Sequence, residues 1–228
     1  MSLPSIIAID GPAASGKSTV AGLLAEWLGY VYFDTGVMYR AVTWVALQQG
    51  LSIADEGGVS ALAEAIHIEV TRPTADDGRQ YTVLVDGQDV TWDLRRPDVD
   101  HGVSPVSAYA GVRRALTAQQ RRLGLRGGIV MAGRDIGTVV LPEADLKIYL
   151  DATVEERARR RWQELQLRDP LADYAVVLAA MKRRDSIDSS RALAPLCPAD
   201  DARVLDTTAL GIEEVLACVK AWVCEAEG

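Results

Sequence analysis

The sequence predicts an α/β fold in which a parallel sheet is covered by helices on both faces. Short apolar runs alternate with longer segments of helical periodicity along most of the chain, an order that is typical of strands joined by helices. Apolar residues make up 49% of the 228 residues and charged residues 25%, as in ordinary globular proteins. Several apolar runs end at an aspartate or a glycine, and ligands bind beyond such strand ends. The length exceeds the usual size of one domain, so we expect a core with a small insert.

The N-terminal part reads as strand, glycine-rich turn, helix, strand and helix. Its first apolar run ends at Asp10, which is the pattern of a short buried strand. Gly29 and Gly50 follow the two helical segments, where glycine is favoured at a helix C-terminus. The expected elements are strands at Ser5–Asp10 and Tyr30–Phe33, a turn at Asp34-Thr35-Gly36, and helices at Thr19–Leu28 and Val37–Gln49.

The middle of the chain changes character. Alternation of apolar and polar residues predicts exposed strands there, and Asp86-Gly87 is a hairpin turn signal. This predicts a small β-rich insert at about 66–95 that interrupts the order of strands and helices. The expected elements are a helix at 57–66 and strands at Ile68–Thr71, Tyr81–Val85 and Gln88–Val90.

The second half returns to alternating helices and strands, as a parallel sheet covered on both faces requires. Two of its strands end in polar groups, one at Gly133-Arg134-Asp135 and the other at Asp151. The expected elements are helices between Pro97 and Leu123, at Thr153–Leu165, at Leu171–Arg184 and at Gly211–Glu225, and strands at Gly127–Met131, Leu146–Leu150 and Val204–Leu205.

The turn after the first strand matches the pattern G-x-x-x-x-G-K-[ST] in full, with a strand before it and a helix after it. In such a phosphate-binding loop (P-loop), backbone N–H groups and the helix N-terminus hold phosphates. The motif places Lys17 at the β- and γ-phosphates and Ser18 as the Mg²⁺ ligand. The residues expected to bind ATP are Gly11, Pro12, Ala13, Ala14, Ser15, Gly16, Lys17, Ser18 and Thr19.

Polar groups at the other strand ends each allow two interpretations. Thr35 and Arg40 suit a second phosphate, but they are also compatible with a helix N-cap and a surface arginine. Arg134 and Asp135 mark either a site or a structural ion pair. The arginines of the helix that begins near Thr153 cannot all share one face, so one or two would reach a transferring phosphoryl group and the rest would be solvated. These are Arg157, Arg159, Arg160 and Arg161.

Charge and composition exclude several classes of protein. The net charge of −8 disfavours a nucleic-acid binder, because such proteins carry a basic surplus. No apolar run approaches the ~20 residues of a membrane span, and no secretory signal is evident. The three cysteines have no metal-binding spacing. We therefore expect a cytoplasmic, monomeric protein with no membrane or nucleic-acid partner.

The ordered set of these motifs resembles the bacterial cytidylate kinase family, from about residue 5 to residue 210. The P-loop is shared by many families, whereas the other blocks are specific in combination. The β-rich insert fits the enlarged monophosphate domain of the bacterial enzymes. The blocks are Asp34-Thr35-Gly36 with Met38-Tyr39-Arg40, Gly133-Arg134-Asp135-Ile136-Gly137-Thr138, and Arg184-Asp185 through Asp188 to Arg191-Ala192 and Ala194-Pro195-Leu196.

The resemblance implies that ATP, with Mg²⁺, phosphorylates CMP and dCMP to CDP and dCDP in pyrimidine nucleotide metabolism. It implies a P-loop kinase core at 1–36 and 102–228, a short lid near 155–165, and a nucleoside monophosphate (NMP)-binding region at 37–101 that contains the insert. The acceptor phosphate would be held by Thr35, Arg40 and Arg134. Cytosine would be read by Ser104, Arg113 and Asp135. The remaining residues expected at the substrate are Tyr39, Arg184 and Asp188 (the last two at the ribose), and Arg191 near the phosphates.

Physical chemistry agrees with this assignment of the base. A carboxylate such as Asp135 accepts from the 4-amino group of cytosine, whereas the guanidinium of Arg113 donates to N3 and O2. Uracil would place a carbonyl oxygen against the carboxylate, and such a buried mismatch discriminates strongly. The acceptor phosphate is already ionised near neutral pH, so catalysis requires positioning and charge stabilisation. The expected catalytic residues are Lys17, Asp34, Arg134, Arg157 and Arg161.

Three alternatives remain open from the sequence. The same chemistry could act on UMP, AMP or a small alcohol, although Ser104, Arg113 and Asp135 disfavour this. A P-loop switch protein or a nucleic-acid-dependent ATPase would also carry the loop. Two departures from the family bear on details of the site: Ala132 stands where many relatives have an acid, and Ser186-Ile187 replaces more highly charged residues.

Overall fold

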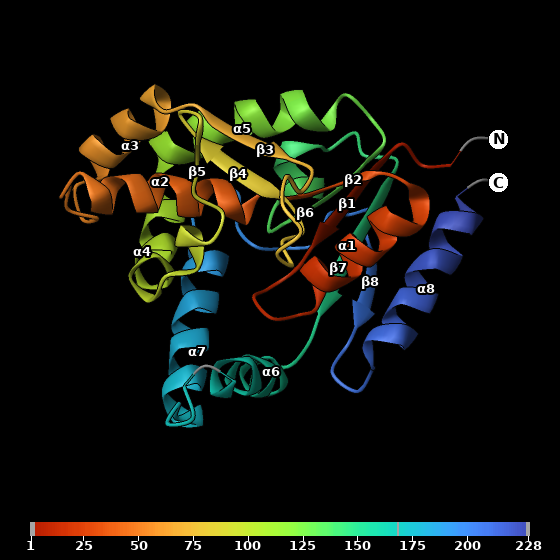
Figure 1. Cartoon of the computed structure of the whole chain (residues 1–228). Helices are drawn as coiled ribbons and strands as arrows, with labels where there is room; N and C mark the ends of the chain where they lie inside the picture. The colour runs from red at the N-terminus through yellow and green to blue at the C-terminus, as the bar shows by residue number, and fades with distance from the viewer. Residues whose placement is uncertain (1–2, 168, 227–228) are drawn as a thin grey trace.

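The computed structural model describes residues 3–167 and 169–226 and contains a five-stranded parallel sheet at its centre. The strand order is β2-β6-β1-β7-β8, so β1 lies in the middle with a crossover on each side (Figure 1). The predicted α/β class is therefore confirmed. The strands are β1 (Ile6–Asp10), β2 (Val31–Asp34), β6 (Ile129–Gly133), β7 (Leu146–Asp151) and β8 (Arg203–Asp206).

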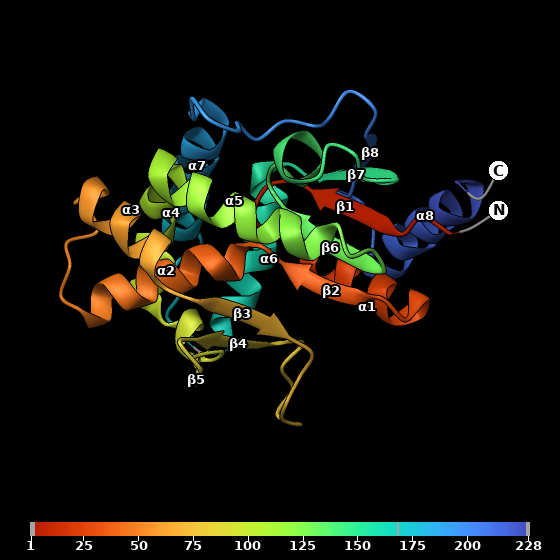
Figure 2. The ribbon, with the colours of Figure 1, turned by 90° about the horizontal axis from the view of Figure 1, so that it is seen from above.

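Side chains alternate between the two faces of this sheet and divide the core into two clusters. Ile7 and Ile9 of β1 contact one face, whereas Ala8 contacts the other. Helices α1 (Lys17–Leu28) and α8 (Ile212–Glu225) cover the first face. Figures 1 and 2 show both helices at the end of the molecule where the chain termini lie.

The second face is covered by a larger helical layer that continues beyond the sheet (Figure 2). Residues of this layer, of the small sheet described next and of the central sheet share one buried cluster. The layer is therefore packed as part of the core. Its helices are α2 (Gly36–Gln48), α3 (Glu56–Ala65), α4 (Pro97–Ala108) and α5 (Ala110–Gly124).

The insert forms a three-stranded antiparallel sheet of β3 (Ile68–Thr71), β4 (Thr82–Val85) and β5 (Gln88–Asp89). The prediction of strands here is confirmed, but the prediction that they are exposed is wrong for β4. Val83 is fully buried and Val85 nearly so, because both pack into the cluster of the helical layer. The central strand of this sheet is therefore part of the core.

Two helices, α6 (Val154–Gln166) and α7 (Tyr174–Ser190), form a separate hairpin with its own small apolar cluster. Figure 1 shows them projecting away from the sheet beneath α4. The helix predicted at Leu171–Arg184 begins later, because the Asp173 side chain caps it by accepting from the N–H of Ala175 at 2.7 Å. It also continues to Ser190, so the charged segment after Arg184 is helical.

The chain around β6 differs from the expectation at both ends. Gly127 and Gly128 have φ of 73° and 60° and form a turn, so the strand begins at Ile129 and continues to Gly133. A π-helical turn, η2 (Ile136–Val140), follows Asp135. A second short turn, the 3-10 turn η1 (Asp93–Arg95), lies elsewhere in the chain and precedes α4. Neither turn has an apolar periodicity that a short window of sequence would show.

The division into core and monophosphate-binding region remains a prediction, and residues 1–2, 168 and 227–228 within it lie outside the described residues. Helix α4 passes through the expected boundary between residues 101 and 102. A helix is cooperative, so a boundary inside it is not a hinge. Among the helices of residues 3–167 and 169–226, none is long and apolar enough to cross a bilayer.

The burial of β4 leads to a stability prediction. We expect Val83→Ala to lower the free energy of unfolding by about 2 kcal/mol, because it removes two methyl groups from a filled core. The matched change Val204→Ala, at a side chain that is 57% exposed, should cost less than about 0.5 kcal/mol. Chemical denaturation of both variants measures the difference, and equal losses would contradict the buried position of β4.

Candidate active site

The parallel register brings the polar strand ends to one edge of the central sheet, as expected from the sequence. Asp10, the last residue of β1, lies opposite Gly133 of β6 and Tyr149 of β7. Asp34, the last residue of β2, lies opposite Ala132 of β6. The P-loop and the Gly133–Asp135 turn therefore start side by side, although more than 120 residues separate Asp10 from Ile136 in the chain.

The P-loop is a tight turn that requires glycine at its first position. Gly11 has φ of 149°, and a Cβ there would lie 2.1 Å from the carbonyl oxygen of Leu150. The Lys17 side chain curls back so that Nζ donates to the carbonyl oxygen of Pro12 at 2.8 Å. Burial, and next the charge of Arg134, hold the pKa of the Lys17 amine well below its usual range. A bound anion would relieve both effects.

Two oxygen groups meet at the start of α1. The Ser18 hydroxyl donates to Oδ2 of Asp34 at 3.1 Å, and Oδ1 of Asp34 accepts from the N–H of Gly36 at 2.9 Å. Mg²⁺ prefers hard oxygen ligands and takes only one or two protein groups when phosphates and waters supply the rest. Within the described residues no group of three or more His, Cys, Asp or Glu side chains could hold a metal. Ser18 and Asp34 therefore fit a magnesium ion that is held mainly by a nucleotide.

Thr35 and Arg40 are drawn into the site by contacts of their side chains. Thr35 stands at the N-cap of α2, yet its hydroxyl makes no cap bond and donates to the carbonyl oxygen of Ala132 at 3.0 Å. Arg40 donates from Nη1 to the carbonyl oxygen of Leu94 at 2.9 Å, and its Nη2 lies 2.6 Å from Asp100. Thr35 is thus the N-cap by position without a side-chain cap bond, and Arg40 is half-buried and held by two partners. That they hold a phosphate stays a prediction.

Arg113 and Asp135 form a buried ion pair between α5 and the turn after β6. Both side chains are at least nine-tenths buried. The Nη1 of Arg113 donates to the carbonyl oxygen of Ser107 at 3.0 Å, and the guanidinium lies 5.6 Å from the ring centre of Tyr39. Ser104, half-buried one turn before Ser107 on α4, accepts through its carbonyl oxygen from the Ser107 hydroxyl. The pair is held in place from several sides.

Tyr39 carries an unsatisfied polar group beside this pair. Its ring is buried on α2 and burial raises its pKa to about 12. Its hydroxyl has no hydrogen-bond partner among the described residues. A buried polar atom without a partner is costly, and such atoms gather where a ligand binds.

A second cluster surrounds Asp188 of α7. Oδ2 of Asp188 accepts from Nε of Arg134 at 2.9 Å, and Oδ1 lies 3.6 Å from Nη1 of Arg191. Burial raises the pKa of this carboxyl, but Arg134, Arg184 and Arg191 together lower it below its usual value. One carboxylate thus neutralises several guanidiniums only in part.

Arg184 shows the resulting surplus of positive charge. Burial, and next the charge of Arg134, lower the pKa of Arg184 to about 10. Among the described residues, Nε of Arg184 and Nε of Arg191 lack a hydrogen-bond partner. A buried cationic cluster of this kind requires an anion, and phosphate is the anion that guanidiniums bind bidentately.

The arginines of α6 are divided between structure and the site. Arg157 is buried: two nitrogens contact Asp185 at 3.1 and 2.7 Å, and Nη1 also donates to the carbonyl oxygen of Ala13 in the P-loop at 3.3 Å. Arg161 is 39% exposed and pairs with Glu164 and Asp100. The structure therefore brings Arg157 to the P-loop and Arg161 toward Arg40.

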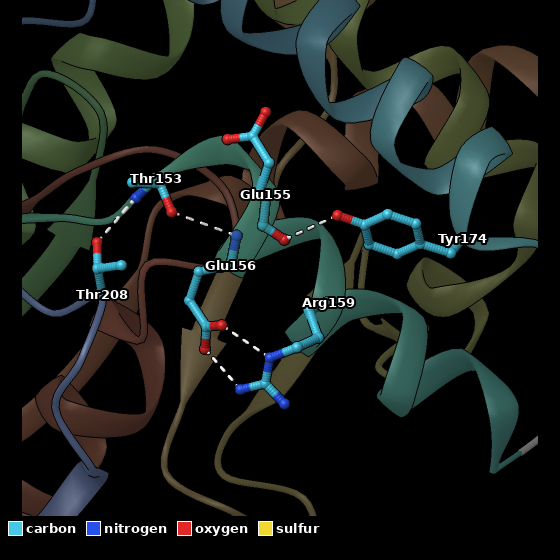
Figure 3. A pocket seen from close by; sticks show the side chains of 6 residues that line it. All are labelled: Thr153, Glu155, Glu156, Arg159, Tyr174 and Thr208. Carbon is cyan, nitrogen blue, oxygen red and sulfur yellow. Dashed lines mark hydrogen bonds and ion pairs between the residues drawn. The ribbon is translucent and has the colours of Figure 1, made fainter.

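A hollow lies beside the P-loop at the start of α6 (Figure 3). The Thr208 hydroxyl accepts from the N–H of Thr153 at 3.0 Å across it. Thr207, which precedes Thr208, donates to the carbonyl oxygen of Ser15 in the P-loop at 3.2 Å. The residues that line the hollow are Thr153, Glu155, Glu156, Arg159, Tyr174 and Thr208.

Sequence reasoning placed Asp10 only at the end of a strand and gave it no role. Its carboxylate accepts from the N–H of Ile136 at 2.8 Å and of Gly137 at 2.7 Å. These bonds fix the turn that carries Arg134 and Asp135 against the P-loop strand. Burial raises the pKa of Asp10 to about 7, and the charge of Asp135 acts in the same direction.

This raised pKa gives a prediction about the pH dependence of stability. Between about pH 4 and pH 7 the unfolded chain loses the Asp10 proton while the folded chain keeps it, so ionisation favours the unfolded state. We expect the free energy of unfolding of the wild-type chain, relative to Asp10→Asn, to fall by about 2 kcal/mol from pH 5 to pH 8. Denaturant titrations at both pH values test it. The control is Asp76→Asn, a change at an exposed side chain. If the difference in free energy of unfolding between wild-type and Asp10→Asn chains does not depend on pH, the pKa of Asp10 is not raised.

Comparisons with known proteins agree with this geometry. A family model described as cytidylate kinase matches residues 7–224. The cytidylate kinase of Herpetosiphon aurantiacus is 52% identical and that of Chloroflexus aggregans 51%, each over 96% of this chain and 94% of its own length. The cytidylate kinase of Enterococcus faecalis is 49% identical over 94% of this chain and 93% of its own.

Similarity among solved structures concerns the fold alone. An uncharacterized protein from Eubacterium ventriosum has a TM-score of 0.51 at 10% identity, with 96% of this chain and 97% of the other covered. The sequence relatives carry the assignment, because the family model spans nearly the whole chain and the identity over that span is about one half. The chain belongs to the cytidylate kinase family.

Proposed function

We propose that the chain transfers the γ-phosphoryl group of ATP to CMP or dCMP and releases ADP with CDP or dCDP. The observation that carries this proposal is the buried pair Arg113–Asp135 beside the surplus of guanidiniums around Asp188. The pair suits a base that offers both a donor and acceptors, and the cluster suits a phosphate. The family membership supports the same reaction.

The base would lie against Asp135 and Arg113. The carboxylate accepts from the 4-amino group of cytosine, and the guanidinium donates to the ring acceptors. Ser104 on α4 is our proposed third contact with the base. Because Arg113 and Asp135 already hold each other, little side-chain entropy is lost when the base binds.

The acceptor phosphate would be held by Arg40 and Arg134, with the guanidinium of Arg184 close by. The three guanidiniums lie near enough to repel one another, because the charges of Arg134 and Arg40 both lower the pKa of Arg184. Thr35 would add a hydroxyl. Asp188, with Arg184, would hold the ribose, and Arg191 would lie near the phosphates. A dianionic phosphate offsets the mutual repulsion of the guanidiniums, which supplies binding free energy.

ATP would bind through the P-loop, with its base in the hollow between Thr153 and Thr208. Arg159 and Tyr174 line that hollow and offer planar groups on which an adenine can stack. Lys17 and the P-loop N–H groups would hold the β- and γ-phosphates. Ser18 and Asp34 would hold Mg²⁺, which neutralises charge on the transferred group.

The chemical step requires alignment more than proton transfer. An oxygen of the acceptor phosphate attacks the γ-phosphorus in line, and the bond to the β-phosphate oxygen breaks as the new bond forms. Lys17, Arg134 and Arg161 would stabilise charge on the migrating group. Arg157 connects α6, α7 and the P-loop through Asp185 and Ala13, so it also positions the lid.

An ADP-release assay with ATP and Mg²⁺ tests the reaction. We expect rapid turnover with CMP and dCMP, slow turnover with UMP, and with AMP a rate close to that without acceptor. The reason is that only cytosine offers an amino group to Asp135. A preference for UMP or AMP would indicate a different monophosphate kinase. If no monophosphate raises ADP release above the acceptor-free rate, the kinase proposal is wrong and a P-loop switch becomes the better hypothesis.

The role of Asp135 can be tested with an isosteric change. We expect Asp135→Asn to lower kcat/KM for CMP by about 100-fold, the cost of losing a buried charged contact. The ratio of kcat/KM values for CMP and UMP should fall as well, because the new amide can donate to the uracil carbonyl. Steady-state kinetics with both nucleotides measure this, with the exposed change Asp76→Asn as control. A loss of activity that leaves the CMP-to-UMP ratio unchanged would contradict base reading by Asp135.

A further inference from the structure

Asp100 lies in the first turn of α4 and contacts two arginines that come from different parts of the fold. Its Oδ1 lies 2.6 Å from Nη2 of Arg40 on α2, and its Oδ2 lies 3.3 Å from Nη2 of Arg161 on α6. Its charge also acts on the half-buried Arg184 of α7. One carboxylate therefore contacts a guanidinium proposed to hold the acceptor phosphate and a guanidinium of the expected lid.

We propose that Asp100 competes with the acceptor phosphate for Arg40 and thereby sets the affinity for the monophosphate. This inference rests on the proposed function, in which Arg40 holds that phosphate. A carboxylate and a phosphate oxygen use the same guanidinium donors. Binding of the nucleotide therefore requires that Asp100 release at least Nη2 of Arg40.

Each of the two arginines has a second partner besides Asp100. Nη1 of Arg40 donates to the carbonyl oxygen of Leu94 at 2.9 Å. Nη1 of Arg161 donates to Oε2 of Glu164 at 3.1 Å. Removing the charge of Asp100 therefore leaves each guanidinium held by another group. The remaining effect of Asp100 on the phosphate is electrostatic repulsion between two negative groups.

The exposure of these groups sets the size of the effect. The side chains of Arg40, Asp100 and Arg161 are 23%, 29% and 39% exposed. Ion pairs that water partly screens contribute only modestly to stability. Removing the negative charge of Asp100 should improve the binding free energy of a nearby dianionic phosphate by a similar amount. We therefore expect an effect of about three- to tenfold on affinity.

The same carboxylate connects acceptor binding to the lid. Asp100 belongs to the helical layer that carries Arg40, whereas Arg161 belongs to α6, the helix in the expected lid region. When phosphate displaces the carboxylate, Arg161 also loses this partner and can turn toward the phosphoryl groups. Asp100 is thus a positioning residue for the lid as well as a competitor.

The experiment compares Asp100→Asn with the wild-type chain at saturating ATP. We expect KM for CMP to fall by about three- to tenfold, and the Kd measured by calorimetry without ATP to fall by a similar factor. Asp98→Asn is the matched control. Asp98 lies in the same turn of α4 and forms an ion pair with the exposed Arg96, through bonds of 3.1 and 2.7 Å. The KM of Asp98→Asn for CMP should equal that of the wild-type chain. Asp100→Glu keeps the charge, so its KM for CMP should also stay near the wild-type value.

Cytidine separates competition for the phosphate from a structural role. Cytidine lacks the phosphate, so its inhibition constant should be the same for wild-type and Asp100→Asn chains. A structural change in the site would alter the binding of both compounds.

Three results overturn the inference. The first is a KM for CMP that is unchanged or raised in Asp100→Asn when the stability of the variant is unchanged. The second is an equal fall of KM in Asp98→Asn, which would indicate a general effect of net charge. The third is an equal fall in the inhibition constant of cytidine. Absence of CMP-dependent ADP release by the wild-type chain instead overturns the proposed function, and this inference with it.

Discussion

Two hydrogen bonds of Asp10 hold the parts of the site together. They connect the strand that leads into the P-loop with the turn that carries Arg134 and Asp135. Each bond runs from a backbone N–H to one oxygen of the buried Asp10 side chain, so both oxygens hold the turn. Because Gly133 has no room for a Cβ between Ile136 and the Thr35 hydroxyl, this turn is also packed tightly from the other side. The positions of both nucleotides therefore depend on one rigid junction.

Charge balance explains the arrangement around that junction. Next to burial, the charges of Arg134 and Arg184 lower the pKa of Lys17, and the charge of Arg134 lowers the pKa of Arg184. Asp188 and Asp100 neutralise this region only in part, and each carboxylate is shared by two arginines. Stability alone would favour fewer buried cations. The site keeps a surplus that a pair of bound phosphates can neutralise, so binding and the assembly of the site are coupled.

The sequence predicted the parts of this site that depend on local rules, because strand ends, the P-loop and the helix stops are set by a few neighbouring residues. It could not predict contacts that depend on register between distant segments. The role of Asp10 requires β1 and β6 to be neighbours, and Asp100 meets Arg161 only through the packing of α4 against the hairpin of α6 and α7. The burial of β4 was missed for a similar reason, since a central strand covered by helices has the same short pattern as an exposed one. The signal for Asp10 was an acid at the end of a buried strand, whereas Asp100 had no distinguishing signal among the acids of its helix.

The two halves of the acceptor site divide affinity from specificity. Every nucleoside monophosphate carries the phosphate that the guanidiniums attract, so this half cannot distinguish one base from another. The Arg113–Asp135 pair is buried and already formed, so a wrong base leaves charged groups unmatched, at a large cost. A carboxylate that opposes the phosphate weakens all monophosphates by the same factor and leaves the ratio between bases unchanged. In the proposed function, Asp100 therefore adjusts the concentration at which the site fills, while Asp135 determines which nucleotide fills it.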